Sequence, residues 1–432
     1  MDSNGSARSR FVTASKMATT VNLFDPVVSA ESDENRDEEI IAEGRRMRLN
    51  ISLAAAFVLL ASACNAAGNS QSIPLQAGIS NPAEASGQAH PNADHTSILK
   101  MLTTTAVVGS TVDPTNGDQN PYGLVYVNTK PFGKSVLKKG DLVVCNFNDQ
   151  ENVQGNGTTV EYMPSIPGSS PTRLIQDPSL KGCASLVINS FDEAYSANSG
   201  AKDAVGVSSA GKIVQTLKNS GLLVEPWGSV YIPSVTGYPP GDGLWVADAS
   251  SGKIVRINLG TGGKPTYTPV ISGFAVNHGV PGSILGPSGM QYNPKNRTLY
   301  IADGVTNTVI AIKNPYDDIF QANSIIVGSN GMTFTGPKAK DASVLFHGQP
   351  LDGPISSALL PNGNLVLGNT LNNNGKNLMV EIASDGTLLA YKNVDKGAAG
   401  ALFGIVATGT SDTTTQIYFN DDNANNIQVL EK

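Results

Sequence analysis

A pattern of large apolar residues, followed by a small residue and then Asp or Asn, recurs six times along the chain. The six copies are Leu142–Asn146, Ala194–Asn198, Leu244–Asp248, Leu299–Asp303, Leu365–Asn369 and Ile417–Asp421. Branched and aromatic residues of this kind favour strands. A short polar side chain after a strand accepts hydrogen bonds from the N–H groups of a tight turn. We therefore predict that each copy, called a strand phrase below, is a strand whose Asp or Asn caps a turn instead of serving in catalysis.

The spacing of the strand phrases predicts how the strands are assembled. Their closing Asp or Asn residues stand at positions 146, 198, 248, 303, 369 and 421, which are 50 to 66 residues apart. This interval is typical of the four-stranded blades of a β-propeller, with the phrase as the second strand from the centre. We predict an all-β fold, a six-bladed β-propeller over residues 98–432.

The last repeat predicts how the propeller closes. Its final strand pattern, Ile427–Leu430, stands directly before Lys432 and leaves no residues for a fourth strand. An unpaired edge would lose backbone hydrogen bonds and invite other strands to pair with it. The β-rich segment Thr103–Gly109 precedes the first repeat. We expect this N-terminal strand to complete the last blade.

A Pro-x-Gly phrase precedes three of the six strand phrases. The three copies are Pro121–Gly123, Pro226–Gly228 and Pro287–Gly289, and variants stand at Gly353–Ser356 and Leu402–Gly404. Pro offers no N–H to a strand partner, and Gly lets the backbone turn sharply. We interpret the phrase as the crossing from the outer strand of one blade to the inner strand of the next.

These phrases resemble a known repeat. Pro-x-Gly followed by Trp245–Asp248 or by Tyr300–Asn307 is similar to the NHL repeat of six-bladed propellers, and the similarity covers roughly residues 104–432. NHL-like propellers include binding scaffolds as well as lyases and lactonase-like hydrolases. The resemblance therefore implies the fold more strongly than an activity.

The N-terminal region has the pattern of an export signal. Arg45, Arg46 and Arg48 precede the apolar run Ile51–Leu60, which ends in the small residues before Cys64. This is the order of a signal peptide, and the run is too short to span a bilayer permanently. The ending also resembles the lipobox of bacterial lipoproteins, in which lipidation of Cys64 would follow cleavage. Ordinary cleavage at the Ala-x-Ala site and an uncleaved anchor remain the alternatives.

Three segments therefore precede the propeller. We expect residues 1–46 to be a disordered or wrongly assigned extension upstream of a true start at Met47, and residues 47–64 to be the signal peptide. Residues 65–97, rich in Ala, Asn, Ser and Gly, are expected to be a flexible linker. The expected location is the bacterial cell envelope, at the outer membrane or in the periplasm through a lipid anchor, with secretion as the alternative.

The net charge of the chain limits the classes of partner that it can bind. Only 15% of the residues are charged and the formal net charge is −7. Nucleic-acid binding needs a basic surface, so this class is excluded. We expect a monomer that binds a small molecule or a protein and meets the membrane only through its anchor.

Two histidines stand in matching His-Gly-x-Pro phrases, at His278 and His347. Each precedes the expected inner strand of a blade, so both imidazoles could meet at one mouth of the central channel. Together with further donors they could bind a divalent metal ion or act in acid–base chemistry. The alternative is a turn phrase that the repeat carries for structural reasons.

Four residues of the Pro-x-Gly region are candidates for ligand binding: Tyr122, Trp227, Ser288 and Phe403. They are expected at the same channel mouth, where they could line a pocket. Tyr and Trp can equally fill such a mouth as packing residues.

The remaining cysteines, Cys145 and Cys183, are expected in the first blade and at the start of the second. In an oxidising compartment they could form a disulfide, and two buried thiols are the alternative.

The sequence favours an exported propeller that binds a ligand or partner and requires no cofactor. A metal-dependent hydrolase or lyase using His278 and His347 is the alternative, and a purely structural surface protein is a third. The catalytic residues stay unknown at this point.

Overall fold

The computed structural model describes residues 93–233, 242–259, 264–280, 282–319, 321–370, 376–397 and 400–432. The expected extension 1–46, the signal peptide 47–64 with Cys64 and most of the linker 65–97 lie outside the described residues. Within the described ranges, no helix has the length and apolar character needed to cross a membrane.

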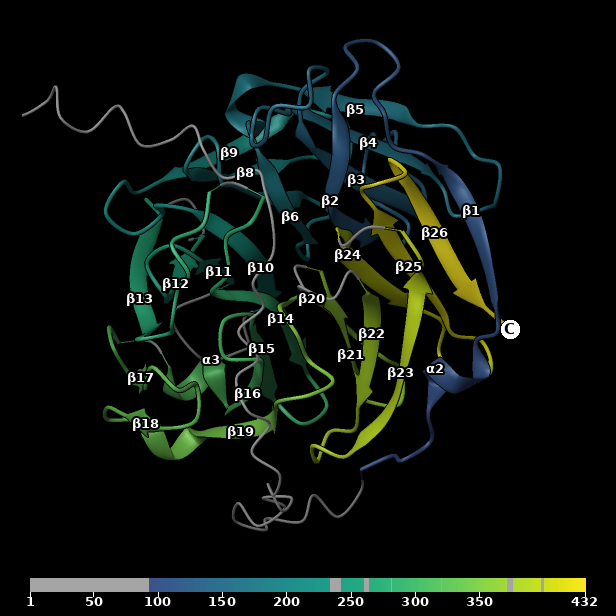
Figure 1. Cartoon of the computed structure of the whole chain (residues 1–432). Helices are drawn as coiled ribbons and strands as arrows, with labels where there is room; N and C mark the ends of the chain where they lie inside the picture. Colours follow the sequence, from purple (N-terminus) through teal and green to yellow (C-terminus); the bar gives the residue numbers. More distant parts are fainter. Residues whose placement is uncertain are drawn as a thin grey trace, which may run out of the picture. The chain divides into compact units, whose positions relative to one another are not determined.

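Six sheets, each with four antiparallel blade strands, surround a common centre (Figure 1). From the innermost to the outermost strand, the first three blades are β2 (Gln119–Tyr126), β3 (Asp141–Asn148), β4 (Thr159–Pro164), β5 (Thr172–Gln176); β6 (Cys183–Ile188), β7 (Ala194–Asn198), β8 (Asp203–Val207), β9 (Ile213–Lys218); and β10 (Pro226–Ile232), β11 (Gly243–Asp248), β12 (Lys253–Asn258), β13 (Thr266–Ser272). The next three are β14 (Pro287–Asn293), β15 (Thr298–Asp303), β16 (Thr308–Lys313), β19 (Ala342–His347); β20 (Pro354–Leu359), β21 (Leu365–Asn369), β22 (Asn377–Ile382), β23 (Leu388–Asp395); and β24 (Ala401–Thr408), β25 (Gln416–Asp421), β26 (Asn426–Glu431), β1 (Thr104–Ser110).

The strand phrases form the second strand of every blade, as predicted. They lie in β3, β7, β11, β15, β21 and β25. The predicted turn caps are confirmed at two aspartates. Asp248 accepts the N–H of Ser251 at 3.0 Å, and Asp303 accepts the N–H of Val305 at 3.0 Å.

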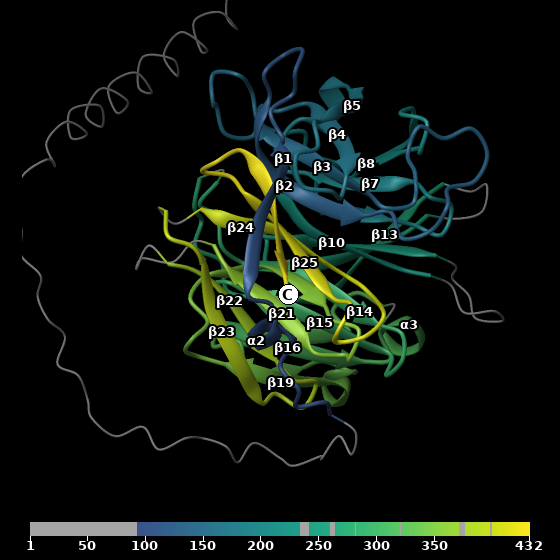
Figure 2. The same cartoon turned by 90° about the vertical axis from the view of Figure 1, so that its right-hand side faces the viewer.

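The fourth strand of the last blade is β1, which pairs antiparallel with β26 from Thr104 opposite Glu431 to Ser110 opposite Asn426. Figure 2 shows β1, in blue, running beside the yellow C-terminal strands. Just before β1, the short helix α2 (Ile98–Met101) buries Ile98 and Leu99 against blades five and six.

A buried carboxylate holds α2 in place. Glu381 of β22 accepts the hydroxyl of Ser97 at 2.5 Å and the N–H groups of Ile98 and Leu99 at 3.0 and 2.9 Å. These bonds satisfy N–H groups that have no partner inside a helix. The N-terminal segment is thereby tied to blade five before it enters blade six.

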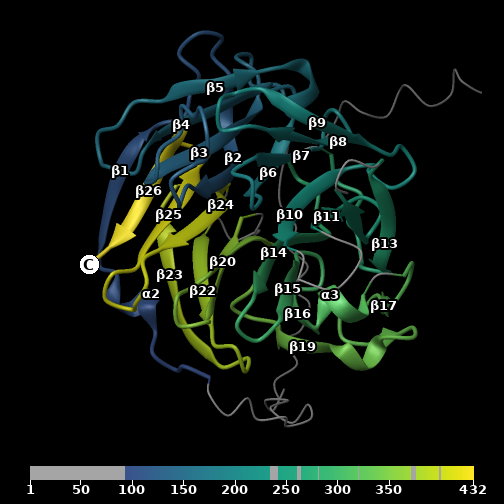
Figure 3. The same cartoon turned by 180° about the vertical axis from the view of Figure 1, so that it is seen from behind.

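Blade three is extended by residues that follow the third strand of blade four. After β16 the chain forms α3 (Pro315–Asp318), β17 (Ile325–Val327), β18 (Phe334–Thr335) and the 3₁₀ turn η2 (Ala339–Asp341), and then enters β19. β17 pairs in parallel with β13 (Figure 3), and β18 pairs with β17. This insertion accounts for the longest interval between strand phrases.

Neighbouring inner strands come so close at the Pro-x-Gly phrases that only glycine fits there. A Cβ on Gly228 would overlap the carbonyl oxygen of Ser288 in blade four, and one on Gly289 would lie 2.9 Å from the carbonyl carbon of Ser356 in blade five. Neither glycine has a positive φ. Close approach between blades, and not a left-handed backbone, therefore requires glycine at these two positions.

A disulfide joins the first two blades. Cys145 of β3 bonds to Cys183 at the start of β6, and both side chains are fully buried. The link closes a loop between residues 38 positions apart. It crosses the interface between the two blades, so separating them requires breaking a covalent bond.

We expect Gly228→Ala to lower the free energy of unfolding by about 1–3 kcal/mol, because the added methyl overpacks the blade interface. Urea denaturation measures this change. Gly221→Ala is the matched control, since its Cβ would meet nothing closer than 3.7 Å, and it should change stability by less than about 0.5 kcal/mol. Equal effects of the two substitutions would contradict the close-approach explanation.

Replacing both cysteines by serine should cost about 2–4 kcal/mol, because the unfolded chain regains the freedom that the closed loop removes. Urea midpoints with and without dithiothreitol check this. The reductant should lower the wild-type midpoint toward that of the double variant and leave the variant unchanged. A wild-type midpoint that the reductant does not move would count against a stabilising disulfide.

Candidate functional site

In each of the six blades, three residues at the equivalent position of the inner strand lie at one mouth of the channel. The triplets are Pro121–Gly123, Cys183–Ser185, Pro226–Gly228, Pro287–Gly289, Pro354–Ser356 and Leu402–Gly404. The pairing register with the second strand shifts at each triplet. Such bulges re-aim a side chain. The middle residues of five triplets meet in one cluster at the mouth.

An aromatic stack fills this mouth. Tyr122 lies between Phe403 and Phe147, with ring centroids 3.7 and 4.2 Å apart and the planes within 8° of parallel. Trp227 meets Tyr122 edge-on at 5.8 Å. All four side chains are buried. We call these residues the aromatic plug.

The structure therefore brings together three of the four predicted ligand-binding residues: Tyr122, Trp227 and Phe403. The fourth, Ser288, is also buried, and its hydroxyl donates to the carbonyl of Pro354 at 3.3 Å. Their side chains contact one another or the neighbouring backbone. The ligand role of these residues stays a prediction.

The two histidines occupy different positions. His278 lies in the loop after β13 with φ 51°, and His347 is the last residue of β19, opposite Thr308. Both side chains are exposed. Among the described residues, no group of three His, Cys, Asp or Glu side chains is arranged to hold a metal ion. The metal role of the pair stays a prediction.

Below the plug, the inner strands line a narrow channel of about 70 Å³. Its wall is partly polar. The hydroxyls of Ser185 and Ser229 lie 2.8 Å apart, and Gln291 donates to the carbonyl of Ser357 at 2.7 Å. Space of this size holds only a few waters. The channel is too small for an organic ligand.

A much larger pocket, of about 820 Å³, opens where the same inner strands end. Each strand passes from channel to pocket within one residue: Leu124 to Val125, Leu186 to Val187 and Ile405 to Val406. The pocket is thus at the opposite end of the channel from the aromatic plug. Its volume lies within the range of pockets that enclose small-molecule ligands. We call it the open-end pocket.

A hydrogen-bonded group stands in the wall of the open-end pocket. The hydroxyl of Tyr231 donates to the carboxylate of Asp242, and Ser190 lies 2.9 Å from the same hydroxyl. Burial, together with this hydrogen bond, raises the pKa of Tyr231 to about 12. Tyr231 therefore stays a neutral phenol at physiological pH, which suits polar binding and not attack by a phenolate.

A second carboxylate shapes the rim of the pocket. Asp192 accepts the hydroxyl of Thr129 at 3.3 Å and the N–H of Phe132 at 3.0 Å. These bonds tie the loop after β2 to the turn before β7. Phe132 and Lys130 of this loop line the pocket, as does Lys139 further along the same connection.

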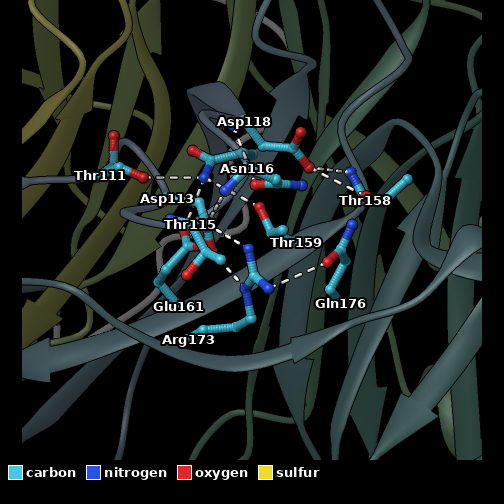
Figure 4. A network of polar contacts seen from close by, with 11 residues as sticks. Thr111, Asp113, Thr115, Asn116, Asp118, Thr158, Thr159, Glu161, Arg173 and Gln176 are labelled. Carbon is cyan, nitrogen blue, oxygen red and sulfur yellow. Dashed lines mark hydrogen bonds and ion pairs between the residues drawn. The ribbon is translucent and has the colours of Figure 1, made fainter. Parts of the chain in front are cut away.

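The first blade contains a separate polar network (Figure 4). Asp113 accepts both Arg173, with Nε at 2.7 Å, and the N–H groups of Thr115 and Asn116 at 2.7 and 2.8 Å. Burial opposes ionisation of Asp113, but the hydrogen bonds from Arg173, Glu161 and the two backbone N–H groups together outweigh it and hold the pKa of Asp113 well below its usual range. Burial and the nearby Asp113 raise the pKa of Glu161.

This network is structural. Asn146, the last residue of the first strand phrase, donates to Glu161 at 2.6 Å and to the carbonyl of Thr111 at 2.9 Å. The guanidinium of Arg173 pairs with the carboxylate of Asp113. The network fixes the connection between β1 and β2 against β4 and β5.

Comparisons with known proteins find only distant similarity. No protein-family model matches the chain, and no curated protein matches it. A virginiamycin B lyase from Staphylococcus aureus shares 16% identity over 76% of this chain and 98% of its own, with a TM-score of 0.45. A gluconolactonase from Xanthomonas campestris shares 12% over 76% and 98%, with a TM-score of 0.48. The calcium-binding protein regucalcin from Agrobacterium tumefaciens shares 14% over 75% and 95%, with a TM-score of 0.43.

The fold is a six-bladed β-propeller. Identities this low leave activity undecided, so the propeller's own surfaces must indicate it.

Sequence reasoning missed the open-end pocket. Its wall uses the last residues of the inner strands, such as Val125 and Val187, and these carry no phrase of their own. The one available signal was the run of lysines at positions 130, 134, 138 and 139. These four lysines make the connection between β2 and β3 basic, which is unusual in a chain with a net negative charge.

The carboxyl group of Asp422, next to the aromatic plug, predicts that the stability of the folded protein depends on pH. Burial and repulsion from Asp421 raise the pKa of Asp422 to about 8, and burial followed by the charge of Asp422 raises the pKa of Tyr122. The native state thus binds this proton more tightly than the unfolded state does. The stabilisation is complete below the unfolded value near pH 4 and is lost as the pH rises toward 8.

We expect Asp422→Asn, which stays neutral, to be more stable than wild type at pH 9 and to lose this advantage at pH 5. Thermal melts at both pH values measure the difference. Glu151→Gln removes an exposed carboxylate and serves as the control. A difference between Asp422→Asn and wild type that is the same at both pH values would contradict the assignment.

Proposed function

We propose that this protein is an exported, lipid-anchored propeller that binds a small ligand or a protein partner at the cell envelope without a cofactor. The observation that carries the proposal is the open-end pocket of about 820 Å³. Most binding sites are single large concave sites of this kind. The channel mouth at one end is plugged, and the open-end pocket at the other end is much larger than the channel of about 70 Å³.

The chemistry of the pocket supports binding. Tyr231, Ser190 and Asp242 already bond to one another, and the pKa of Tyr231 is too high for it to act as a base or nucleophile near neutral pH. Fixed polar groups in an apolar wall orient a ligand.

The disulfide supports export. Disulfides persist in the periplasm and outside the cell and are rare in the cytosol. The bond between Cys145 and Cys183 is therefore in keeping with the predicted signal peptide at residues 47–64.

We expect the neutral dye N-phenyl-1-naphthylamine to bind the wild-type protein and to gain fluorescence, because the pocket offers an apolar wall. Ala407→Trp and Asn128→Trp each place a large ring at the pocket lining. Each should weaken dye binding at least tenfold, as titration would measure.

Ala424→Trp, in an exposed turn of blade six, is the matched control and should bind the dye as wild type does. Melting curves establish that each variant is folded. Full dye binding by folded Ala407→Trp and Asn128→Trp would overturn the proposal.

A further inference from the structure

We propose that the open-end pocket selects an anionic amphiphile, a ligand with one acidic group on an apolar body, and that Lys130 and Lys139 hold the acidic group. This inference rests on the proposed function, because it names the class of ligand for the same pocket.

The apolar part of the ligand would meet the ends of the inner strands. Val125 of β2, Val187 and Ile188 of β6, and Val406 and Ala407 of β24 line the pocket together. These side chains come from three blades and are all partly exposed. Covering them removes apolar surface from water, which is the main favourable contribution to binding an alkyl chain or ring.

The acidic group would meet two lysines. Lys130 and Lys139 stand at either end of one loop in the connection between β2 and β3, and both line the pocket. Neither takes part in the ion pairs found among the described residues. Each ammonium group therefore has its charge available to a ligand at the rim.

The carboxylates around the lysines have other partners. Asp192, which lines the same pocket, accepts Thr129 and the N–H of Phe132, and Asp242 accepts Tyr231. The Asp192 bonds also fix the backbone beside Lys130. Lys130 and Lys139 balance the lining carboxylate Asp192 and the adjacent Asp242, so this rim is not acidic, in a chain whose net charge is −7. An anion is attracted here more than to the protein as a whole.

The same loop bears Lys134, Lys138 and the exposed ring of Phe132, which is 78% accessible. A basic loop with an exposed aromatic ring can also rest on an anionic membrane. We favour a ligand in the pocket because Lys130, Lys139 and Phe132 all line one large cavity, whereas Lys134 and Lys138 do not. This difference provides the matched control.

The experiment measures displacement of N-phenyl-1-naphthylamine from the full mature chain by decanoate, 1-decanol and decyltrimethylammonium, all below their micelle concentrations. We expect decanoate to bind at least about fivefold more tightly than decanol, and decyltrimethylammonium to bind most weakly. The expected difference is modest because each exposed ion pair contributes little free energy. Lys130→Gln/Lys139→Gln should lower decanoate affinity to that of decanol and leave decanol unchanged. Lys134→Gln/Lys138→Gln should change neither.

Other results would overturn the inference in distinguishable ways. If the dye does not bind wild type, the proposed function itself fails. If the dye binds but decanoate and decanol displace it equally, the pocket binds ligands without selecting anions. If both lysine pairs weaken decanoate equally, the effect is general surface charge. If vesicles containing anionic lipid bind the protein through Phe132 and all four lysines while decanoate does not displace the dye, the loop is a membrane contact.

Discussion

The structure depends on the close approach of neighbouring inner strands around the channel. At Gly228 and Gly289 one strand touches the backbone of the next, so no side chain fits between them. This contact fixes how far the first strands stand from the axis. The distance in turn decides what can occupy the centre: an aromatic stack at one end, a channel of about 70 Å³ in the middle and space for a ligand only where the strands diverge.

Two blades replace the glycine by serine, and the replacement changes the chemistry of the channel wall. Ser185 in blade two bonds to Ser229 of blade three, and Ser356 in blade five donates to the carbonyl of Leu402 in blade six. Hydroxyl groups therefore bridge these interfaces, where glycine leaves direct backbone contact elsewhere. Neighbouring inner strands thus contact each other either through backbone packing at glycine or through a hydrogen bond from serine.

Much of the fold was predictable because the strand phrase reports burial directly. Large residues at β11 or β15 pack between blades, and Asp248 and Asp303 cap turns by local bonds, so both signals lie within five residues. The site was less predictable because its geometry is not local. The His-Gly-x-Pro phrases share a sequence, yet His347 ends a strand that follows the inserted β17 and β18, whereas His278 lies in a loop several residues beyond its strand. The sequence could place Tyr122 and Phe403 at one mouth, but a pocket built from the ends of strands in separate blades has no contiguous pattern.

The pairing of β17 with β13 has a consequence for how the propeller comes apart. Residues that belong to the connection within blade four complete the outer edge of blade three, so these two blades share strands as well as an interface. Blades one and two share a covalent bond, and blade six takes its outer strand from the opposite end of the chain. In linear repeat proteins each unit contacts only its neighbours, so folding can begin at any unit and propagate along the array. Here the blades are linked in pairs and across the termini, which favours loss of structure in a single cooperative step.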